Sequence, residues 1–183
     1  MIITIGGDFG SGKTTLAAAL AQTLGYDELK VGNIVRMMAA DRGVKIDEFS
    51  ELLKTDPELE RLVDEQQVHA MKERDNRVIQ SRLAWFFAKE SPFKVFNVCL
   101  TVDPKVGAQR TAMKMENLGK SLDSILAMNL ERKQNELERF RSLYNIENYL
   151  DRSHYDLVID TTNLSVGEKV TEILNKIKPH GNS

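Results

Sequence analysis

Short apolar runs rich in β-branched residues alternate along the chain with longer stretches of helical period. Runs of this kind are typical of strands in a parallel sheet, which is buried on both faces. After the first run, Leu16, Leu20 and Leu24 repeat every four residues, which predicts an amphipathic helix that stops near Gly25. The strands are expected at residues 2–5, 29–31, 78–79, 95–102 and 157–159.

Three further helices begin with capping signals. Asp56 and Asp103 each precede a proline, which is tolerated at the first helical position because an N–H there would have no partner in the helix. Ser165 with Glu168 matches a capping box for the last helix. Strands that alternate with helices predict an α/β fold with a parallel sheet of about five strands flanked by helices, and ligands bind such sheets at the carboxyl ends of the strands.

Two long stretches interrupt this alternation. Residues 33–74 predict two or three helices without a strand, and residues 111–148 are also helical and rich in charge. In the second stretch the apolar stripe ends at Leu130 and resumes at Leu137, and residues 131–136 are all polar. A helix that is polar all round for a turn and a half is not packed on a core there. We expect this part of the helix to project over a solvent-filled cleft.

The composition narrows the class of protein. With 183 residues the chain suits one domain, 1–183, and 42% apolar with 28% charged residues is ordinary for a folded protein. A net charge of −2 gives no electrostatic reason to expect nucleic acid or an anionic membrane as a partner. No apolar stretch approaches the roughly 20 residues of a membrane span. Cys99 is the only cysteine, so we expect a cytoplasmic protein, with a monomer as the default.

The loop after the first predicted strand carries the strongest chemical signal. Residues 7–14 read Gly-Asp-Phe-Gly-Ser-Gly-Lys-Thr and match the P-loop pattern G-x-x-x-x-G-K-[ST] at every defined position, between a strand and a helix. The glycines let backbone N–H groups turn inward around an anion, and the helix N-terminus adds a partial positive charge. The alternative, a glycine-rich turn that only joins two elements, is disfavoured because both motif and context are met.

A P-loop predicts a nucleoside triphosphate, here ATP, bound with Mg²⁺. Lys13 can reach the β- and γ-phosphate oxygens, and the Thr14 hydroxyl can bind the magnesium ion. The motif does not identify the acceptor of the phosphoryl group. The loop residues predicted to bind ATP are Gly7, Asp8, Phe9, Gly10, Ser11, Gly12, Lys13, Thr14 and Thr15.

Beyond the loop, the chain resembles the cytidylate kinase group of P-loop nucleoside monophosphate kinases, in its bacterial form, over about residues 1–177. Four segments carry the resemblance. They are residues 2–15, residues 31–36 (Val-Gly-Asn-Ile-Val-Arg), residues 81–85 (Ser-Arg-Leu-Ala-Trp) with 93–96, and residues 155–162 (Tyr-Asp-Leu-Val-Ile-Asp-Thr-Thr) together with the arginine-bearing helix at 131–144.

The resemblance implies a P-loop kinase fold and ATP-dependent phosphorylation of CMP or dCMP. Residues 33–74 would bind the acceptor monophosphate and residues 111–148 would form a lid. Arginine suits such a site because its planar fork binds phosphate oxygens in pairs. By analogy, Arg36 and Arg82 hold the acceptor phosphate, Arg132 and Arg139 neutralise the transferring phosphoryl group, Arg110 binds the donor nucleotide, and Asp64 accepts a hydrogen bond from the cytosine amino group.

Each of these roles has a structural alternative. Arg132 and Arg139 are seven residues apart and share a helix face, which also fits an exposed face of weak salt bridges. Arg82 follows a predicted buried strand, where it is either a ligand of phosphate or half of a buried ion pair. For Asp64 the alternative is an ordinary carboxylate on a helix surface.

The chain also departs from the pattern that it resembles. Lys133 and Gln134 stand where a second arginine and an acid are frequent after the first lid arginine, and Gln80 stands where an acid is frequent. Lysine keeps the charge but loses the fork of arginine. Two other functions therefore stay open: a P-loop kinase with a different small acceptor, and a nucleotide-binding regulatory module with weak or no transfer.

Overall fold

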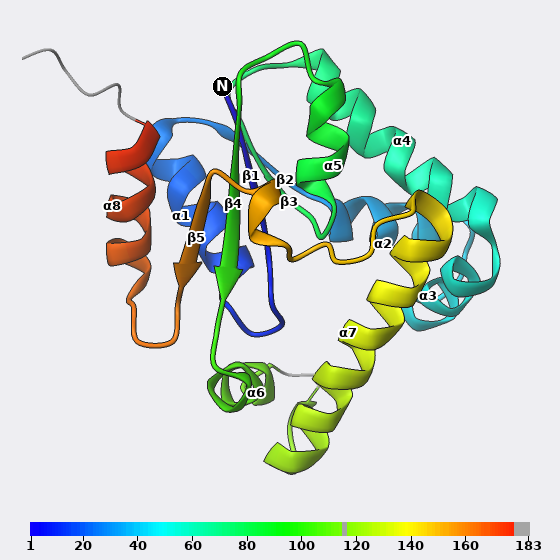
Figure 1. The fold of residues 1–183 in the computed structure, drawn as a ribbon. Coiled ribbons are helices and arrows are strands. Elements are labelled where there is room, and N and C mark those ends of the chain that lie inside the picture. Colours follow the sequence, from blue (N-terminus) through cyan, green and yellow to red (C-terminus); the bar gives the residue numbers. More distant parts are fainter. Residues whose placement is uncertain (115–116, 178–183) are drawn as a thin grey trace, which may run out of the picture.

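The computed structural model describes residues 1–114 and 117–177, and its centre is one parallel β-sheet. The strands are β1 (Ile2–Gly7), β2 (Asp27–Lys30), β3 (Arg77–Gln80), β4 (Val95–Thr101) and β5 (Leu157–Asp160), in the order β2-β3-β1-β4-β5 (Figure 1). All four pairings are parallel, and β1 lies in the middle of the sheet, hydrogen-bonded to both β3 and β4. The predicted five-stranded parallel sheet is confirmed.

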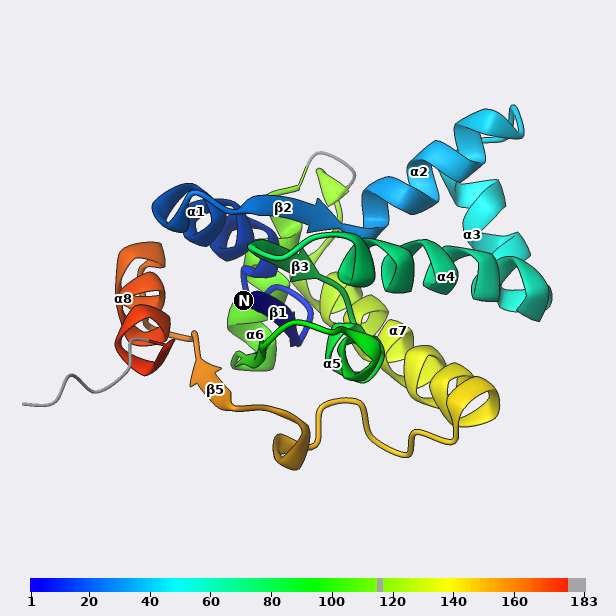
Figure 2. The same ribbon diagram turned by 90° about the horizontal axis from the view of Figure 1, so that it is seen from above.

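Helices pack on both faces of this sheet (Figure 2). On one face α1 (Lys13–Leu24) and α8 (Val166–Ile177) cover Ile3, Ile5, Val98 and Ile159. On the other face the residues that cover Ile2 and Ile79 come from α4 (Pro57–Glu73), the short α5 (Ala84–Phe87) and the carboxyl half of α7 (Leu122–Tyr144).

The remaining helices extend beyond the sheet. They are α2 (Val31–Asp41), α3 (Ile46–Thr55), α6 (Pro104–Ala112) and the short 3₁₀ turns at Ala88–Glu90 and Arg152–His154. Residues 31–73 thus form three helices without a strand, as the sequence predicts. Val31, expected to end the second strand, instead begins α2, because the pairing of β2 with β3 stops at Lys30 and Gln80.

The predicted caps are confirmed. The Asp56 carboxylate accepts hydrogen bonds from the N–H groups of Glu58 and Leu59, both at 3.1 Å, and the Asp103 carboxylate accepts equivalent bonds at the start of α6. Gly25 ends α1 in the left-handed conformation, with φ of 65°. The two aspartates satisfy N–H groups that lack partners inside the helix and so fix where α4 and α6 begin, whereas the Gly25 N–H satisfies carbonyl oxygens at the end of α1.

Helix α7 is the element that leaves the body of the molecule. Its carboxyl half is anchored by the buried Phe140, but Leu122 and Leu130 are 40% and 55% exposed. The wholly polar stretch between Leu130 and Leu137 borders a large cleft, as the sequence pattern indicates. Across residues 1–114 and 117–177, no helix is both long and apolar enough to cross a membrane.

Candidate active site

The glycine-rich loop lies at the carboxyl end of β1, the strand that pairs with β3 on one side and with β4 on the other. Gly10 has a φ of 73°, and a Cβ atom there would overlap the carbonyl of Gly107 on α6. A Cβ on Gly107 would in turn lie 2.7 Å from the Phe9 carbonyl oxygen. Glycine is therefore required at both positions, because the loop and α6 are in direct backbone contact.

Lys13 is the first residue of α1 and is almost completely buried. Its Nζ donates hydrogen bonds to the Gly7 carbonyl oxygen, at 2.9 Å, and to the Asp8 carbonyl oxygen. Burial lowers the pKa of this ammonium group well below its usual value, and the nearby Arg82 charge lowers it further. The side chain thus curls over its own loop, where an anion would relieve the cost of its burial.

Beside the loop lies a cavity of about 550 Å³ that we call the loop cavity. It is bordered by Gly10, Gly12, Thr14 and Thr15 of the loop and the start of α1. Among the described residues its lining contains no aspartate or glutamate. The cationic side chains that line it are Lys13, Arg82, Arg110, Lys114 and Lys169.

Arg110 connects α6 to the segment that follows β5. Its Nη2 donates to the carbonyl oxygens of Thr161, at 2.8 Å, and Thr162, at 3.0 Å. The guanidinium therefore fixes one wall of the loop cavity. Asp160, at the end of β5, accepts hydrogen bonds from the N–H and the hydroxyl of Thr162, so its carboxylate caps the turn that follows.

The oxygen atoms suited to magnesium lie at the mouth of the same cavity. The Thr14 hydroxyl donates to the Gln80 Oε1 atom at 3.1 Å. In the part of the chain that the structure describes, no cluster of three or more His, Cys, Asp or Glu side chains could hold a metal by itself. Hard oxygen donors without a full protein cage fit a magnesium ion that is bound mainly by phosphate oxygens and water.

A second hollow, of about 890 Å³, lies between α7 and the α3–α4 region, and we call it the helix cleft. Arg132, Glu136 and Arg139 line it from α7, and Pro57 lines it from α4. Phe9 of the glycine-rich loop lines both the helix cleft and the loop cavity. Both hollows therefore border this side chain, and we call this place, next to the predicted phosphate site, the junction.

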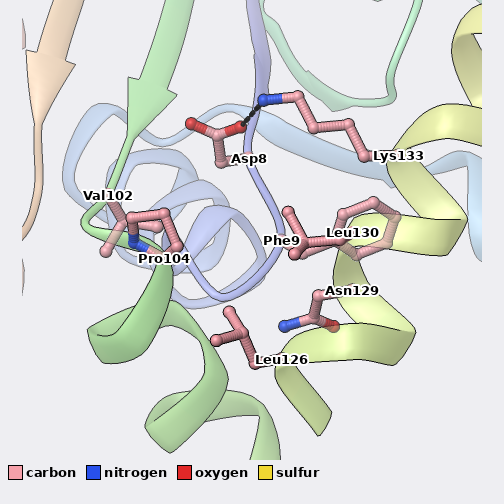
Figure 3. Close-up of a pocket in the computed structure, with 8 residues that line it drawn as sticks. All are labelled: Asp8, Phe9, Val102, Pro104, Leu126, Asn129, Leu130 and Lys133. Atoms are coloured by element: carbon pink, nitrogen blue, oxygen red, sulfur yellow. Dashed lines mark hydrogen bonds and ion pairs between the residues drawn. The ribbon is translucent and has the colours of Figure 1, made fainter. Parts of the chain in front are cut away.

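Three charged side chains of α7, spaced three residues apart, bind three different elements around this junction. Lys133 Nζ lies 2.9 Å from Asp8 Oδ1 of the loop (Figure 3), Glu136 Oε2 lies 2.9 Å from Arg82 Nε after β3, and Arg139 Nε lies 3.6 Å from Glu60 Oε1 on α4. Figure 3 also shows Leu126 and Leu130 of α7 lining one pocket together with Phe9. The three charge pairs connect α7 to the loop, to the segment after β3 and to α4.

The predicted site residues divide into three groups. Lys13, Thr14, Thr15, Arg82 and Arg110 share the loop cavity with Phe9, Gly10 and Gly12 of the loop. Arg132 and Arg139 share the helix cleft. The third group lines neither of these two hollows and consists of Arg36, Asp64 and the loop residues Gly7, Asp8 and Ser11.

Arg36 is exposed on α2, where its Nη1 donates to Asn33 Oδ1 at 2.7 Å. Asp64 is half-buried between α4 and the end of α7, where it accepts a hydrogen bond from the Tyr144 hydroxyl and lines a separate hollow with Val68 and His69. Burial raises the pKa of Asp64 to about 7, against the lowering effect of the Tyr144 hydrogen bond. This is not an ordinary surface carboxylate, and its role toward cytosine stays a prediction.

Three residues of the site were missed by reasoning from the sequence. Lys169 of α8 borders the loop cavity, Glu136 binds Arg82, and Tyr149 donates from its hydroxyl to Glu136 Oε2 at 2.8 Å. Glu136 had a detectable signal, because it lies one helical turn after Arg132. Lys169 and Tyr149 had none, because the cavity that Lys169 borders is formed by distant parts of the chain and Glu136 lies 13 positions before Tyr149, outside the helix turn that a local pattern describes.

A glycine-rich loop of the P-loop pattern after the first strand of a parallel sheet, beside a cavity lined by five lysine and arginine side chains, is characteristic of a P-loop kinase fold. The chain belongs to the cytidylate kinase-like family, whose model matches residues 2–163. The expected family is confirmed.

Relatives with established names support the family over most of the chain. A cytidylate kinase of Natronomonas pharaonis is 37% identical over 166 residues, which cover 90% of this chain and 83% of that protein. A cytidylate kinase of Pyrococcus abyssi is also 37% identical, over 90% of this chain and 87% of its own length. Both relatives are archaeal, whereas the sequence motifs resemble the bacterial form.

Solved structures share the fold at low sequence identity. An uncharacterized protein from Eubacterium ventriosum superposes with a TM-score of 0.73 at 18% identity, covering 97% of this chain and 98% of its own. A shikimate kinase from Bacteroides thetaiotaomicron superposes with a TM-score of 0.63 at 19% identity, covering 96% and 97% of the two chains. At these identities the likeness shows the P-loop kinase architecture.

Proposed function

We propose that this protein transfers the γ-phosphoryl group of ATP to CMP or dCMP. The observation that carries the proposal is the position of Phe9 between the cation-lined loop cavity and the helix cleft that carries Arg132 and Arg139, beside the glycine-rich loop. A donor in one hollow and an acceptor in the other would meet there. The names of the relatives, cytidylate kinases over about nine-tenths of this chain, support cytidylate as the acceptor.

The loop cavity is the proposed donor site. The loop N–H groups and the α1 N-terminus would bind the phosphate chain, and Lys13 would leave the Gly7 and Asp8 carbonyls to neutralise it. Thr14, with Gln80 beside it, would help to hold Mg²⁺, which when bound neutralises charge on the phosphates. Arg110 would border the nucleotide through the wall that it stabilises.

The helix cleft is the proposed acceptor side. Arg82, which follows β3 and lines the adjoining loop cavity, would orient the acceptor phosphate at the junction, and Arg132 and Arg139 of the helix cleft would neutralise the charge that develops during transfer. An in-line transfer of this kind needs positioning and charge neutralisation and no covalent enzyme intermediate. We further infer that residues 33–74 and 111–148 close over the substrates and exclude water, so that ATP is not hydrolysed.

Two of the three positions that depart from the family pattern are engaged in the site, whereas Gln134 donates to Glu138 on the exposed side of α7. Lys133 pairs with Asp8 of the loop, and Gln80 accepts the hydroxyl of Thr14. Both contacts support an assembled catalytic site over a regulatory module that has lost transfer, and the relatives' names do not favour a different small acceptor. We infer a cytoplasmic monomer, for which the buried, unpaired Cys99 suits a reducing compartment.

An acceptor panel tests the proposal. Purified protein with ATP and Mg²⁺ is assayed for ADP release with CMP, dCMP, UMP, AMP and shikimate, each at the same concentration. We expect CMP or dCMP to give the highest kcat/KM. Release of ADP with UMP, AMP or shikimate but not with CMP and dCMP would assign another acceptor. Binding of ATP without release of ADP for any acceptor would favour the regulatory module.

A further inference from the structure

Arg82 borders the junction of the two hollows, and contacts with three residues hold its side chain. Its Nε donates to both carboxylate oxygens of Glu136, at 3.0 and 2.9 Å. Its Nη1 lies 3.4 Å from the Gly7 carbonyl oxygen, and its Cζ lies 4.2 Å from the centre of the Phe9 ring. Nη2 has no hydrogen-bond partner within residues 1–114 and 117–177, although Arg82 lines the loop cavity.

Glu136 is in turn held by the core of the molecule. The Tyr149 hydroxyl donates to Glu136 Oε2 at 2.8 Å, and the side chain of Tyr149 is completely buried against Phe140, with ring centres 5.3 Å apart at 90°. The backbone carbonyl of Tyr149 accepts hydrogen bonds from Trp85 Nε1, at 3.2 Å, and from the Tyr155 hydroxyl, at 2.7 Å. Tyr149 therefore has a fixed position from which it orients the carboxylate.

The charges within this chain of contacts are balanced. Burial is the largest single influence and disfavours the guanidinium form of Arg82, but Glu136, together with smaller contributions from Tyr149 and Asp8, outweighs it, so the pKa of Arg82 is raised. Burial, with Glu136 as the second cause, raises the pKa of Tyr149. The negative charge of Glu136 is thus bound by two donors and does not face incoming phosphates as a free charge.

We propose that Glu136 is a positioning residue for the transfer reaction, which Tyr149 holds in place so that Arg82 presents its Nη atoms to the phosphate at the junction. Because the Nε edge is bound to Glu136, the guanidinium cannot rotate away from the loop, and its remaining donors are oriented before substrate binds. Preorganised donors of this kind lower the barrier of a reaction that depends on charge neutralisation. The role in transfer rests on the proposed function, whereas the restraint on Arg82 does not.

A double-mutant cycle tests the role in transfer. We expect Glu136→Ala to lower kcat/KM for CMP about tenfold with the KM for ATP changed less than twofold, Glu136→Gln to recover part of the loss, and Tyr149→Phe to lower it about threefold. If Glu136 acts through Arg82, Glu136→Ala has no further effect in an Arg82→Ala background. Independent, multiplying losses in the double variant, or unchanged activity in Glu136→Ala, would overturn the proposal.

The restraint itself is measured without any acceptor. In ¹H–¹⁵N spectra the Arg82 Nε–H signal, assigned from its loss in Arg82→Lys, should exchange slowly with water in the parent protein and at least tenfold faster in Glu136→Ala. The matched control is Glu138→Gln, two residues further along α7, whose carboxylate is bound only by Gln134 among the described residues. An Nε–H signal that is equally protected in both variants would refute the restraint, even if the protein proved not to phosphorylate CMP.

Discussion

Lys13 is the side chain on which donor binding depends most directly. Its Nζ donates to two carbonyl oxygens of the loop. To neutralise the charge of a bound triphosphate, the ammonium group must leave these carbonyls and move to the phosphates. We expect Lys13→Ala to lower kcat by about 100-fold or more, the usual cost of removing a preorganised charge from a transition state. The measurement is steady-state transfer with circular dichroism to check the fold. Near-normal turnover would contradict the role.

A second prediction for a single residue concerns Lys169. Its side chain is only 5% exposed, borders the loop cavity close to Gly12, and has no hydrogen-bonded or ion-pair partner in the described part of the chain. Burial lowers its pKa, and the Arg110 charge lowers it further. A buried ammonium without an acid favours an anionic ligand. We expect Lys169→Met to weaken binding of MgATP about tenfold, equivalent to about 1.4 kcal/mol.

Inorganic tripolyphosphate shows which part of the donor Lys169 contacts. Calorimetric titration should show the same loss of affinity for tripolyphosphate as for ATP, because the proposed contact is with phosphate. Lys176→Met, at an exposed position of the same helix, is the control and should bind both ligands normally. A loss confined to ATP would indicate a contact with the base or the sugar instead.

At the scale of elements, the contact between α6 and the glycine-rich loop has no room for a side chain. A Cβ at Gly107 would lie 2.7 Å from the Phe9 carbonyl oxygen and 3.1 Å from a methyl group of Val102. We expect Gly107→Ala to push α6 from the loop, to lower the free energy of unfolding by about 1–3 kcal/mol, and to weaken ATP binding. Denaturant titration and calorimetry measure the two effects.

A second glycine-to-alanine variant serves as the control for Gly107→Ala. Gly167 lies in the first turn of α8 and has nothing within 4 Å of its Cβ position. Gly167→Ala should leave ATP binding unchanged and raise the free energy of unfolding by about 0.5–1 kcal/mol, because alanine favours a helix over glycine. Equal losses of affinity in both variants would show that the contact between α6 and the loop is not the cause.

The sequence predicts the elements better than it predicts their contacts. The P-loop, the strands and the helix starts at Asp56 and Asp103 depend on neighbouring residues, so local patterns suffice. The pairs of α7 with the rest of the site do not: Lys133 binds a residue 125 positions away, and Arg82 and Glu136 are 54 positions apart. Which carboxylate faces which cation depends on how α7 crosses the loop, and no local pattern encodes that.

At the scale of the whole molecule, Asp64 couples global stability to pH. Its pKa of about 7 in the folded protein, against a usual 3.8, means that the folded state keeps a proton that the unfolded chain releases. As pH rises from about 4 to about 7, Asp64 ionises in the unfolded chain while it stays mostly protonated in the folded protein, so the free energy of unfolding falls. The difference of about three between the two pKa values of Asp64 corresponds to a loss of no more than about 4 kcal/mol in the free energy of unfolding.

Asp64→Asn removes this pH dependence while keeping an oxygen that can accept the Tyr144 hydroxyl. Relative to the parent protein, the variant should be more stable at pH 8 than at pH 5, and urea titrations at the two pH values measure the difference. A difference in unfolding free energy that is the same at both pH values would show that Asp64 ionises as freely in the folded protein as in the unfolded chain.

The central claim, transfer from ATP to cytidylate, is tested most directly by following both nucleotides at once. Phosphorus NMR of the protein with ATP, Mg²⁺ and CMP resolves the β-phosphate of ATP, the phosphate of CMP and inorganic phosphate, and ion-exchange chromatography of the same mixture separates CDP from ADP, whose phosphate signals overlap. We predict that CDP grows as ATP falls, one for one, with no matching rise of inorganic phosphate. Loss of ATP into inorganic phosphate without CDP, or no loss of ATP at all, would contradict the account.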